Sequence, residues 1–422
     1  MAVGFGGYLE ILKARHAARL LSGTLVGRLP NATAAIAIVL FVRAEGGTYS
    51  LAGALAAVYG VANAVGQPVL GRLVDLYGQP RVQLPAALAA ALAMTAFALT
   101  GTQPAALAYA SVAAAGLFTP PLEGGLRALW PSVLRRNDQV HTAYAMDAVA
   151  QEVMFTVGPL LVTLCVSLWS APTALVVLNG IGVLGALSVV VSPPSRAWRS
   201  EPREAHWLGA LRSPGLLALL GAFLFVGVAM GSITVAAVPY ADDHGGDAVY
   251  GWLMAALGLG ALVGGTVYGA RQWAGTPERR LRLLVGLLAV CYLPLMLMPG
   301  AVPMVALTVL SGVFLAPCIA CAFIIVDRHA PAGTVTEAFS WLVTTFTVGA
   351  SVGTGVAGPV VQEGGALWGF AVPGAAGAVS LLVLVLSGRV LTAPAAGAVV
   401  AASSENDPNR AAEPRLSAED RA

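Results

Sequence analysis

The sequence predicts an all-α membrane protein with twelve transmembrane helices arranged as two six-helix repeats. Three observations support this fold class. The 422-residue chain is 57% hydrophobic and only 10% charged, far from the balance of soluble globular proteins. Apolar runs of about 20 residues, the length that a helix needs to cross a bilayer, recur from end to end. Glycine and proline patterns of the first half return in the second half at a shift of about 195–200 residues.

Twelve runs are long and apolar enough to span a membrane. In the first half they cover residues 20–43, 51–72, 82–102, 104–128, 143–168 and 172–192. In the second half they cover residues 214–240, 248–270, 281–299, 302–326, 337–361 and 365–388.

These runs divide the chain into four parts. We expect an N-terminal six-helix bundle in residues 1–192 and a C-terminal one in residues 214–390. Residues 193–213 are polar and rich in proline and arginine, which is typical of a cytoplasmic linker. Residues 391–422 have no apolar period and predict a disordered cytoplasmic tail.

The distribution of Lys and Arg predicts that both termini are cytoplasmic. With the N-terminus inside, Lys13 and most of the arginines that flank the spans share one side of the membrane. The opposite loops carry Arg43 as the clear exception and an acidic group at residues 242–247. We therefore expect a multi-pass protein of the plasma (inner) membrane. The composition, rich in Ala and Gly, is typical of a bacterium with a GC-rich genome.

The internal repeat is visible at several separate elements. Gly66 and Gly71 return as Gly264 and Gly269. The segment Gly116-Leu117-Phe118, followed by Pro121, returns as Gly312-Val313-Phe314, followed by Pro317. A nearly constant shift across separate elements is not explained by composition, and it predicts two halves that run in the same direction through the membrane.

A short charged stretch, from Gly71 to Arg81, separates the second and third spans. Gly71 and Gly78 allow two membrane helices to approach closely, and Asp75 lies where both would meet water. The spacing of Gly71, Asp75, Gly78 and Arg81 resembles the signature between the second and third helices of major facilitator superfamily (MFS) transporters. Leu76 stands where that signature usually has a basic residue.

The resemblance covers the chain to about residue 390 and implies the MFS fold, with the two halves moving to give access to a central site from either side. In the family, the carboxylate at the position of Asp75 caps a helix of the opposite half when the inside is closed. The resemblance therefore implies that Asp75 contacts the start of the eleventh span, near Thr336, and Arg81. In the second repeat Trp273 stands where Asp75 stood.

Charged groups inside a bilayer are costly, so they are candidates for function. The first half carries a few, namely Arg28 beside Asn31 in the first span, Glu123 and Arg127 in the fourth, and Asp147 and Glu152, with Gln151 between them, in the fifth. In the second half the sequence predicts no comparable buried charge.

The resemblance implies that the first, fourth, seventh and tenth spans line the central cavity, with the fifth beside them. We therefore expect Arg28, Glu123 and Glu152 to converge on one pocket. One arginine can balance the charge of only one carboxylate. If it faces more than one, the extra carboxylate can gain and lose a proton. Glu152 is the first candidate for this proton site and Glu123 the second. Arg28, Asn31, Glu123, Gln151 and Glu152 are the predicted substrate- and proton-binding residues.

Several of these residues also have a purely structural interpretation. Glu123 and Arg127 are four residues apart and can pair on one helix face. Asp147 lies one turn from the predicted start of its helix, where an acidic residue suits the helix dipole. Gly158-Pro159 resembles part of an antiporter motif, but both residues are also common where membrane helices kink or pack.

The predicted function is proton-coupled efflux of a small amphipathic or apolar organic molecule by a monomer surrounded by lipid. Proton-coupled uptake of a small metabolite and a non-transporting membrane sensor of the same fold are the alternatives. We expect no enzyme, because no set of nucleophile and base is present. We expect no cofactor or metal, since there is neither a phosphate-binding loop nor a metal-ligand spacing. A net charge of +2 does not indicate nucleic acid as a partner.

Overall fold

The computed structural model describes residues 6–134, 136–202, 206–271 and 273–392. Within these residues, eleven helical segments are long and apolar enough to cross a membrane. The longest, α15 (Val335–Leu386), joins two spans across a kink at Gly365, where φ is 74° and ψ is −174°. With α15 counted as two spans, the described residues contain the twelve spans that the sequence predicts.

The bounds of the helices define the two halves. The first half contains α1 (Gly6–Lys13), α2 (Ala17–Ala44), α3 (Tyr49–Tyr77), α4 (Gln79–Thr100), α5 (Ala105–Leu117), α6 (Leu122–Val133), α7 (Asn137–Leu168) and α8 (Ala171–Val190). Next come α9 (Pro193–Ala197) and the 3-10 helix η1 (Gly209–Arg212). The second half contains α10 (Pro214–His244), α11 (Asp247–Gly269), α12 (Pro277–Tyr292), η2 (Leu293–Leu297), α13 (Ala301–Gly312), α14 (Leu315–His329), α15 and α16 (Gly388–Thr392).

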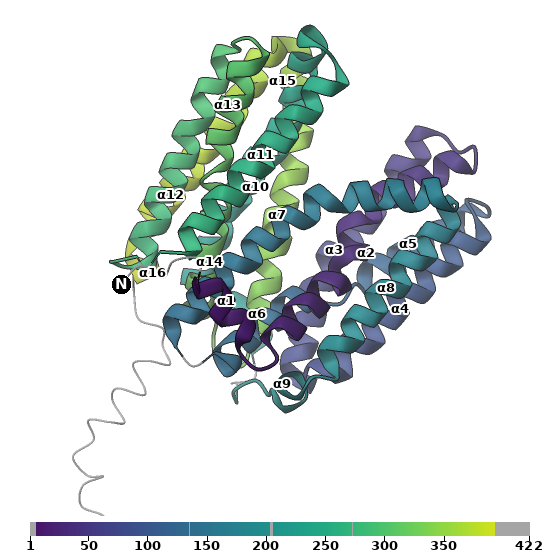
Figure 1. The fold of residues 1–422 in the computed structure, drawn as a ribbon, viewed down its shortest axis with the longest axis vertical. Coiled ribbons are helices and arrows are strands. Elements are labelled where there is room, and N and C mark those ends of the chain that lie inside the picture. Colours follow the sequence, from purple (N-terminus) through teal and green to yellow (C-terminus); the bar gives the residue numbers. More distant parts are fainter. Residues whose placement is uncertain (1–5, 135, 203–205, 272, 393–422) are drawn as a thin grey trace, which may run out of the picture.

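The two halves meet at one end and diverge toward the other (Figure 1). The end where they meet carries α1, α6 and α14, and we call it the inner end. Helix α7 packs against α11 and α14 of the second half and against α2 and α8 of the first. It bends along its length (Figure 1), and Pro159, inside the helix, lacks the N–H that a continuous helix needs. The cytoplasmic location of the inner end stays a prediction.

The internal repeat is confirmed by an identical backbone contact in each half. A Cβ atom added to Gly66 would lie 2.1 Å from the carbonyl oxygen of Leu117, so α3 and α5 touch through their backbones. The equivalent Gly264 lies against the end of α13, and its added Cβ would be 1.7 Å from the oxygen of Val313, the residue that follows α13. Only glycine allows these approaches, which explains why it recurs at both positions.

The fourth and tenth spans are each broken into two helices, whereas the sequence predicted continuous helices over residues 104–128 and 302–326. The fourth breaks between α5 and α6, where Pro120 and Pro121 lack backbone N–H groups. The tenth breaks between α13 and α14, just before Pro317 in the first turn of α14. Each break lies at the repeated motif, and α6 and α14 both end up at the inner end.

The predicted tail begins two residues too early. Leu391 belongs to α16, is only 2% exposed, and its carbonyl accepts a hydrogen bond from His329 Nε2 at 2.9 Å. The rest of the predicted tail, residues 393–422, lies outside the described residues.

The short helix α1 connects the two halves at the inner end. The Tyr8 hydroxyl donates to the carbonyl of Thr266 in α11 at 2.9 Å. On the first half, Glu10 accepts a hydrogen bond of 3.1 Å from Gln139 in α7, and Ile11 is 1% exposed in the hydrophobic core. Helix α1 therefore contributes to the contact between the halves.

Replacing Tyr8 with phenylalanine should weaken this contact. A single hydrogen bond contributes about 0.5–1.5 kcal/mol net, so the inner-closed state should lose about three- to tenfold in population relative to the inner-open one. The measurement is the distance distribution between spin labels at the exposed positions 196 and 279, in a background without the native cysteines. The control is Tyr109→Phe in α5, and equal distributions for the two variants would contradict the prediction.

Candidate functional site

Four charged side chains from three helices of the first half form one network. Arg28 in α2 contacts Glu123 in α6 at 2.7 Å and Asp147 in α7 at 3.1 Å. Arg127 in α6 contacts the same two acids, Asp147 at 2.6 Å and Glu123 at 3.3 Å. Each arginine therefore faces both carboxylates, and we call these four residues the charge network.

The charge network is buried and balanced. Arg127 and Asp147 are completely inaccessible, and Arg28 and Glu123 are 6% and 15% exposed. Two positive and two negative groups leave no net charge. Ionised groups away from water need such partners, because an unpaired buried charge costs several kcal/mol.

Local sequence places these side chains on facing surfaces. Glu123 and Arg127 are four residues apart on α6, the short helix that begins after the break in the fourth span. Asp147 and Gln151 have the same spacing on α7, and the Gln151 amide oxygen accepts from Arg127 at 3.4 Å. Residues four apart lie on one face of a helix, so each helix presents a pair to the other.

The interpretation of Asp147 as a residue of the helix start is wrong. Helix α7 begins at Asn137 rather than at residue 143, because the polar residues before the apolar run are helical too. Asp147 therefore lies well inside the helix, at the centre of the charge network. The sequence predicted only the pair of Arg127 with Glu123, whereas Arg127 pairs with Asp147 as well.

Glu152 lies outside the charge network. It follows Gln151 on α7 and is 9% exposed. The ion pairs that Arg28 and Arg127 make with described residues are with Glu123 and Asp147 and do not include Glu152. Of the three residues expected to converge, the structure brings together Arg28 and Glu123, with Asp147 in the place expected for Glu152.

Asn31 lines a separate cavity within the first half. This cavity of about 360 Å³, counted with the part open to solvent, lies among α2, α3, α4, α5 and α8. The Asn31 side-chain oxygen accepts a 3.3 Å hydrogen bond from Tyr59, whose hydroxyl is also 3.1 Å from that of Thr119. Asn31 is thus close in sequence to Arg28 but does not contact the charge network.

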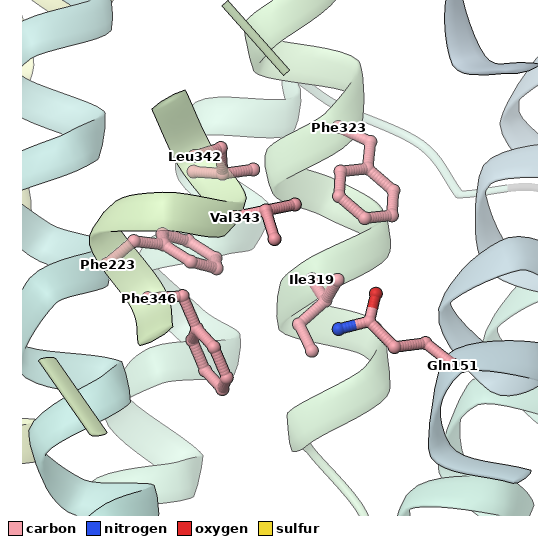
Figure 2. Close-up of a pocket in the computed structure, with 7 residues that line it drawn as sticks. All are labelled: Gln151, Phe223, Ile319, Phe323, Leu342, Val343 and Phe346. Atoms are coloured by element: carbon pink, nitrogen blue, oxygen red, sulfur yellow. The ribbon is translucent and has the colours of Figure 1, made fainter. Parts of the chain in front are cut away.

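A second cavity, of about 260 Å³, lies between the two halves. Figure 2 shows Gln151 entering it from α7 on one side, with apolar side chains of α10, α14 and α15 on the other. The apolar residues are Phe223, Ile319, Phe323, Leu342, Val343 and Phe346. We call this cavity the interface pocket. It was missed by the sequence analysis, because its aromatic residues come from three helices and share no motif.

The charge network touches the interface pocket through Arg127. The guanidinium carbon lies 3.7 Å from the centre of the Phe323 ring, within cation–π distance. Arg127 Nη1 has no hydrogen-bond partner among the described residues, so the ring is its neighbour instead. Arg127 therefore contacts the acids of the first half and the aromatic wall of the second.

The inner end is closed by Asp75. Its two carboxylate oxygens accept hydrogen bonds from the backbone N–H groups of Thr336 and Glu337, at 3.0 and 2.9 Å. These N–H groups open α15 and have no partner within the helix, and the positive end of the helix dipole favours a carboxylate there. Asp75 belongs to the first half and α15 to the second, so these bonds join the halves.

Glycines on either side allow this close approach. A Cβ atom on Gly71 would lie 2.7 Å from the Ser340 hydroxyl, and one on Gly124 would lie 3.0 Å from the Thr336 oxygen. Gly78 ends α3 with a φ of 87°, a conformation that favours glycine. Gly158, further along α7, packs against α2, where an added Cβ would be 3.2 Å from Thr33.

The two arginines that flank Asp75 in the sequence, Arg72 and Arg81, make other contacts than the resemblance implies. Arg81 is exposed in the first turn of α4, and the hydrogen bonds of the described residues do not include its side chain. Arg72 instead donates to the carbonyls of Trp207 and His206, at 2.7 and 3.0 Å. The basic residue that holds the linker against α3 is therefore Arg72.

The expectation that the second half buries no charge is wrong. Glu278 and Glu337 are 6% and 3% exposed, in the first turns of α12 and α15. Glu278 lies 3.5 Å from Arg328. Helix α12 begins at Pro277, before its predicted span of residues 281–299, so Glu278 fell in a predicted loop. Glu337 is the first residue of the predicted span 337–361, and the packing of the inner end covers both acids.

Comparison with known proteins identifies the fold. The sequence profile described as Major Facilitator Superfamily matches residues 20–331. No curated protein sequence matches the chain. A structure of the human organic anion transporter MFSD10 (TETRAN) is 18% identical with a TM-score of 0.65, and the match covers 87% of this chain and 99% of that one.

Two further structures are similar over nearly their whole length. A bacterial homologue of the iron transporter ferroportin, in an outward-facing state, has a TM-score of 0.69 at 15% identity, and the match covers 88% of this chain and 99% of that one. The fucose:proton symporter FucP of E. coli has a TM-score of 0.65 at 17% identity, with 87% and 97% covered. Such low identities show a shared fold and assign no substrate.

The profile match covers most of the chain, and the twelve-span architecture is that of the solved transporters. The chain therefore belongs to the Major Facilitator Superfamily, a family of multi-pass membrane transporters whose usual location is the plasma membrane.

Proposed function

We propose that the protein is a secondary active transporter that moves a small organic molecule across the plasma membrane by alternating access, driven by protons and in the direction of export. The observation that carries this proposal is the interface between the halves. A balanced charge network on the first half faces an aromatic wall on the second, beside a pocket that both halves line.

The arrangement of the two ends supports alternating access. At the inner end Asp75 caps a helix of the opposite half, while the halves diverge toward the other end (Figure 1). The bonds of Asp75 to Thr336 and Glu337, and that of Tyr8 to Thr266, lie near helix ends, so they can break without unfolding either half. The site would then open to the inner side.

Glu152 is the proposed proton site. It is buried in α7 and directly follows Gln151, which lines the interface pocket. A carboxylate in this place changes the charge of the interface when it binds a proton, and can therefore link proton uptake to the motion of the halves. Gly158-Pro159 of the same helix, against α2, supports export because of its resemblance to an antiporter motif.

A thermal-shift screen of the purified protein first identifies a substrate. The test is then the flux of this substrate into proteoliposomes under a pH gradient. Glu152→Gln should lower gradient-driven flux by about tenfold or more and leave exchange without a gradient largely intact. Glu363→Gln, at an exposed acid in α15, is the control. Unchanged gradient-driven flux in Glu152→Gln would refute the assignment of the proton site. If the wild-type protein moves its substrate inward rather than outward, the result favours proton-coupled uptake.

A further inference from the structure

The interface pocket has one polar side chain among the residues that line it. Gln151 enters from α7, and every other lining residue is aliphatic or aromatic. The space between these side chains, counted together with the part that is open to solvent, is about 260 Å³. Three of its apolar lining residues, Phe223, Phe323 and Phe346, carry aromatic rings.

The orientation of the Gln151 amide follows from its neighbour. Arg127 is a donor only, so the atom that it contacts at 3.4 Å must be the amide oxygen. The NH₂ group is then directed away from Arg127, and Figure 2 shows the nitrogen turned toward Ile319, inside the pocket. This group has no hydrogen-bond partner among the described residues. The pocket therefore offers a donor to its ligand.

The charge preference of the pocket follows from the other contact of Arg127. The guanidinium covers one face of the Phe323 ring, at 3.7 Å, and the ring also lines the pocket. A cationic ligand against this ring would share it with Arg127 and be repelled. An anion gains little, since the charge network is already balanced by Glu123 and Asp147.

We propose that the interface pocket binds neutral molecules that combine one aromatic ring with a hydrogen-bond acceptor such as a carbonyl group. The ring packs between the aromatic side chains of α10, α14 and α15, and the acceptor receives a hydrogen bond from Gln151. The assignment rests on the proposed function only in taking this pocket as the transport site.

Four probes that share a benzene ring test the ligand class. N,N-dimethylbenzamide is neutral with an acceptor, benzyltrimethylammonium is a cation, benzoate is an anion, and tert-butylbenzene has no acceptor. Binding is measured by equilibrium dialysis of radiolabelled probe against the full chain in nanodiscs, with empty nanodiscs subtracted. The amide should bind about tenfold more tightly than either ion. Tighter binding of the cation, or no binding of the amide above the empty nanodiscs, would overturn the proposal.

Two substitutions test the role of Gln151. Gln151→Leu should weaken binding of the amide about three- to tenfold and leave tert-butylbenzene unchanged, because only the amide uses the lost donor. The contact of Gln151 with Arg127 is also lost, but it is lost equally for every probe. Gln151→Glu keeps an oxygen for Arg127 and removes the donor, so it should shift the preference from the amide toward the cation. Gln362→Leu, at an exposed position of α15, is the control. Equal affinities of the amide for all these variants would refute the role of Gln151.

Transport separates this inference from the proposed function. If the amide binds as expected but the protein does not carry it across proteoliposome membranes, the assigned ligand class stands and the transport proposal fails. If another compound is transported while the amide does not bind, the transport proposal stands and the assigned ligand class fails.

Discussion

Replacing Asp147 with alanine is expected to destabilise the protein more than any other change to a charged residue considered above. Asp147 is completely buried and contacts both Arg28 and Arg127. Its loss leaves two buried cations with only Glu123 between them. Breaking a buried ion pair by removing one partner costs about 3–5 kcal/mol. We expect the melting temperature of the purified protein to fall by about 3–6 °C.

The control for this prediction is Asp138→Ala on the same helix. Asp138 pairs with Arg136, but both side chains are partly exposed, at 27% and 59%. Exposed ion pairs contribute about 0–1 kcal/mol, so this variant should melt close to the wild type. The thermal denaturation of both variants, followed by intrinsic fluorescence, gives the comparison. Equal melting temperatures would show that the charge network does not stabilise the fold.

Replacing Asp75 with alanine is expected to open the inner end. The substitution removes both hydrogen bonds to the first turn of α15 and the negative charge at its N-terminus. Each bond to a charged group contributes about 1.5–3 kcal/mol, so the ratio of inner-closed to inner-open molecules should fall by about tenfold or more. Distances between spin labels at positions 196 and 279 should become longer and more broadly distributed.

An asparagine at position 75 separates the two contributions of Asp75. Asp75→Asn keeps one acceptor oxygen but has no charge, so its distance distribution should lie between those of the wild type and Asp75→Ala. A distribution for Asp75→Ala that matches the wild type would show that other contacts hold the inner end closed.

The fold was largely predictable because a bilayer permits few architectures. A segment must be helical, apolar and about 20 residues long to cross it, and these properties are read from sequence alone. The position of Asp75 against Thr336 followed from the resemblance of the Gly71–Arg81 stretch to a family motif, since such a motif carries information about a contact between distant residues. The breaks after α5 and α13 were not predicted, because apolar windows do not detect a turn between two apolar helices.

The candidate site was predictable only in part. Arg28 and Glu123 were found because charge is rare in membrane spans. Asp147 was misjudged because its burial depends on where α7 begins, and that start lies outside the apolar window. The partners of a buried side chain depend on how the helices pack, which is why Glu152 was expected beside Arg28, where the structure has Asp147. The same reason applies to Phe223, Phe323 and Phe346, which meet only in the folded protein.

The glycine contacts at Gly66 and Gly264 have a consequence for how the molecule moves. Where main chain touches main chain, no flexible side chain remains to absorb a shift, so α3 and α5 cannot slide past each other, and neither can α11 and α13. Each half should then be stiff, so that a displacement at the inner end is transmitted to the far end. Inhibitors that act by blocking the movement of the halves should therefore bind at the interface between the two halves and not inside either half.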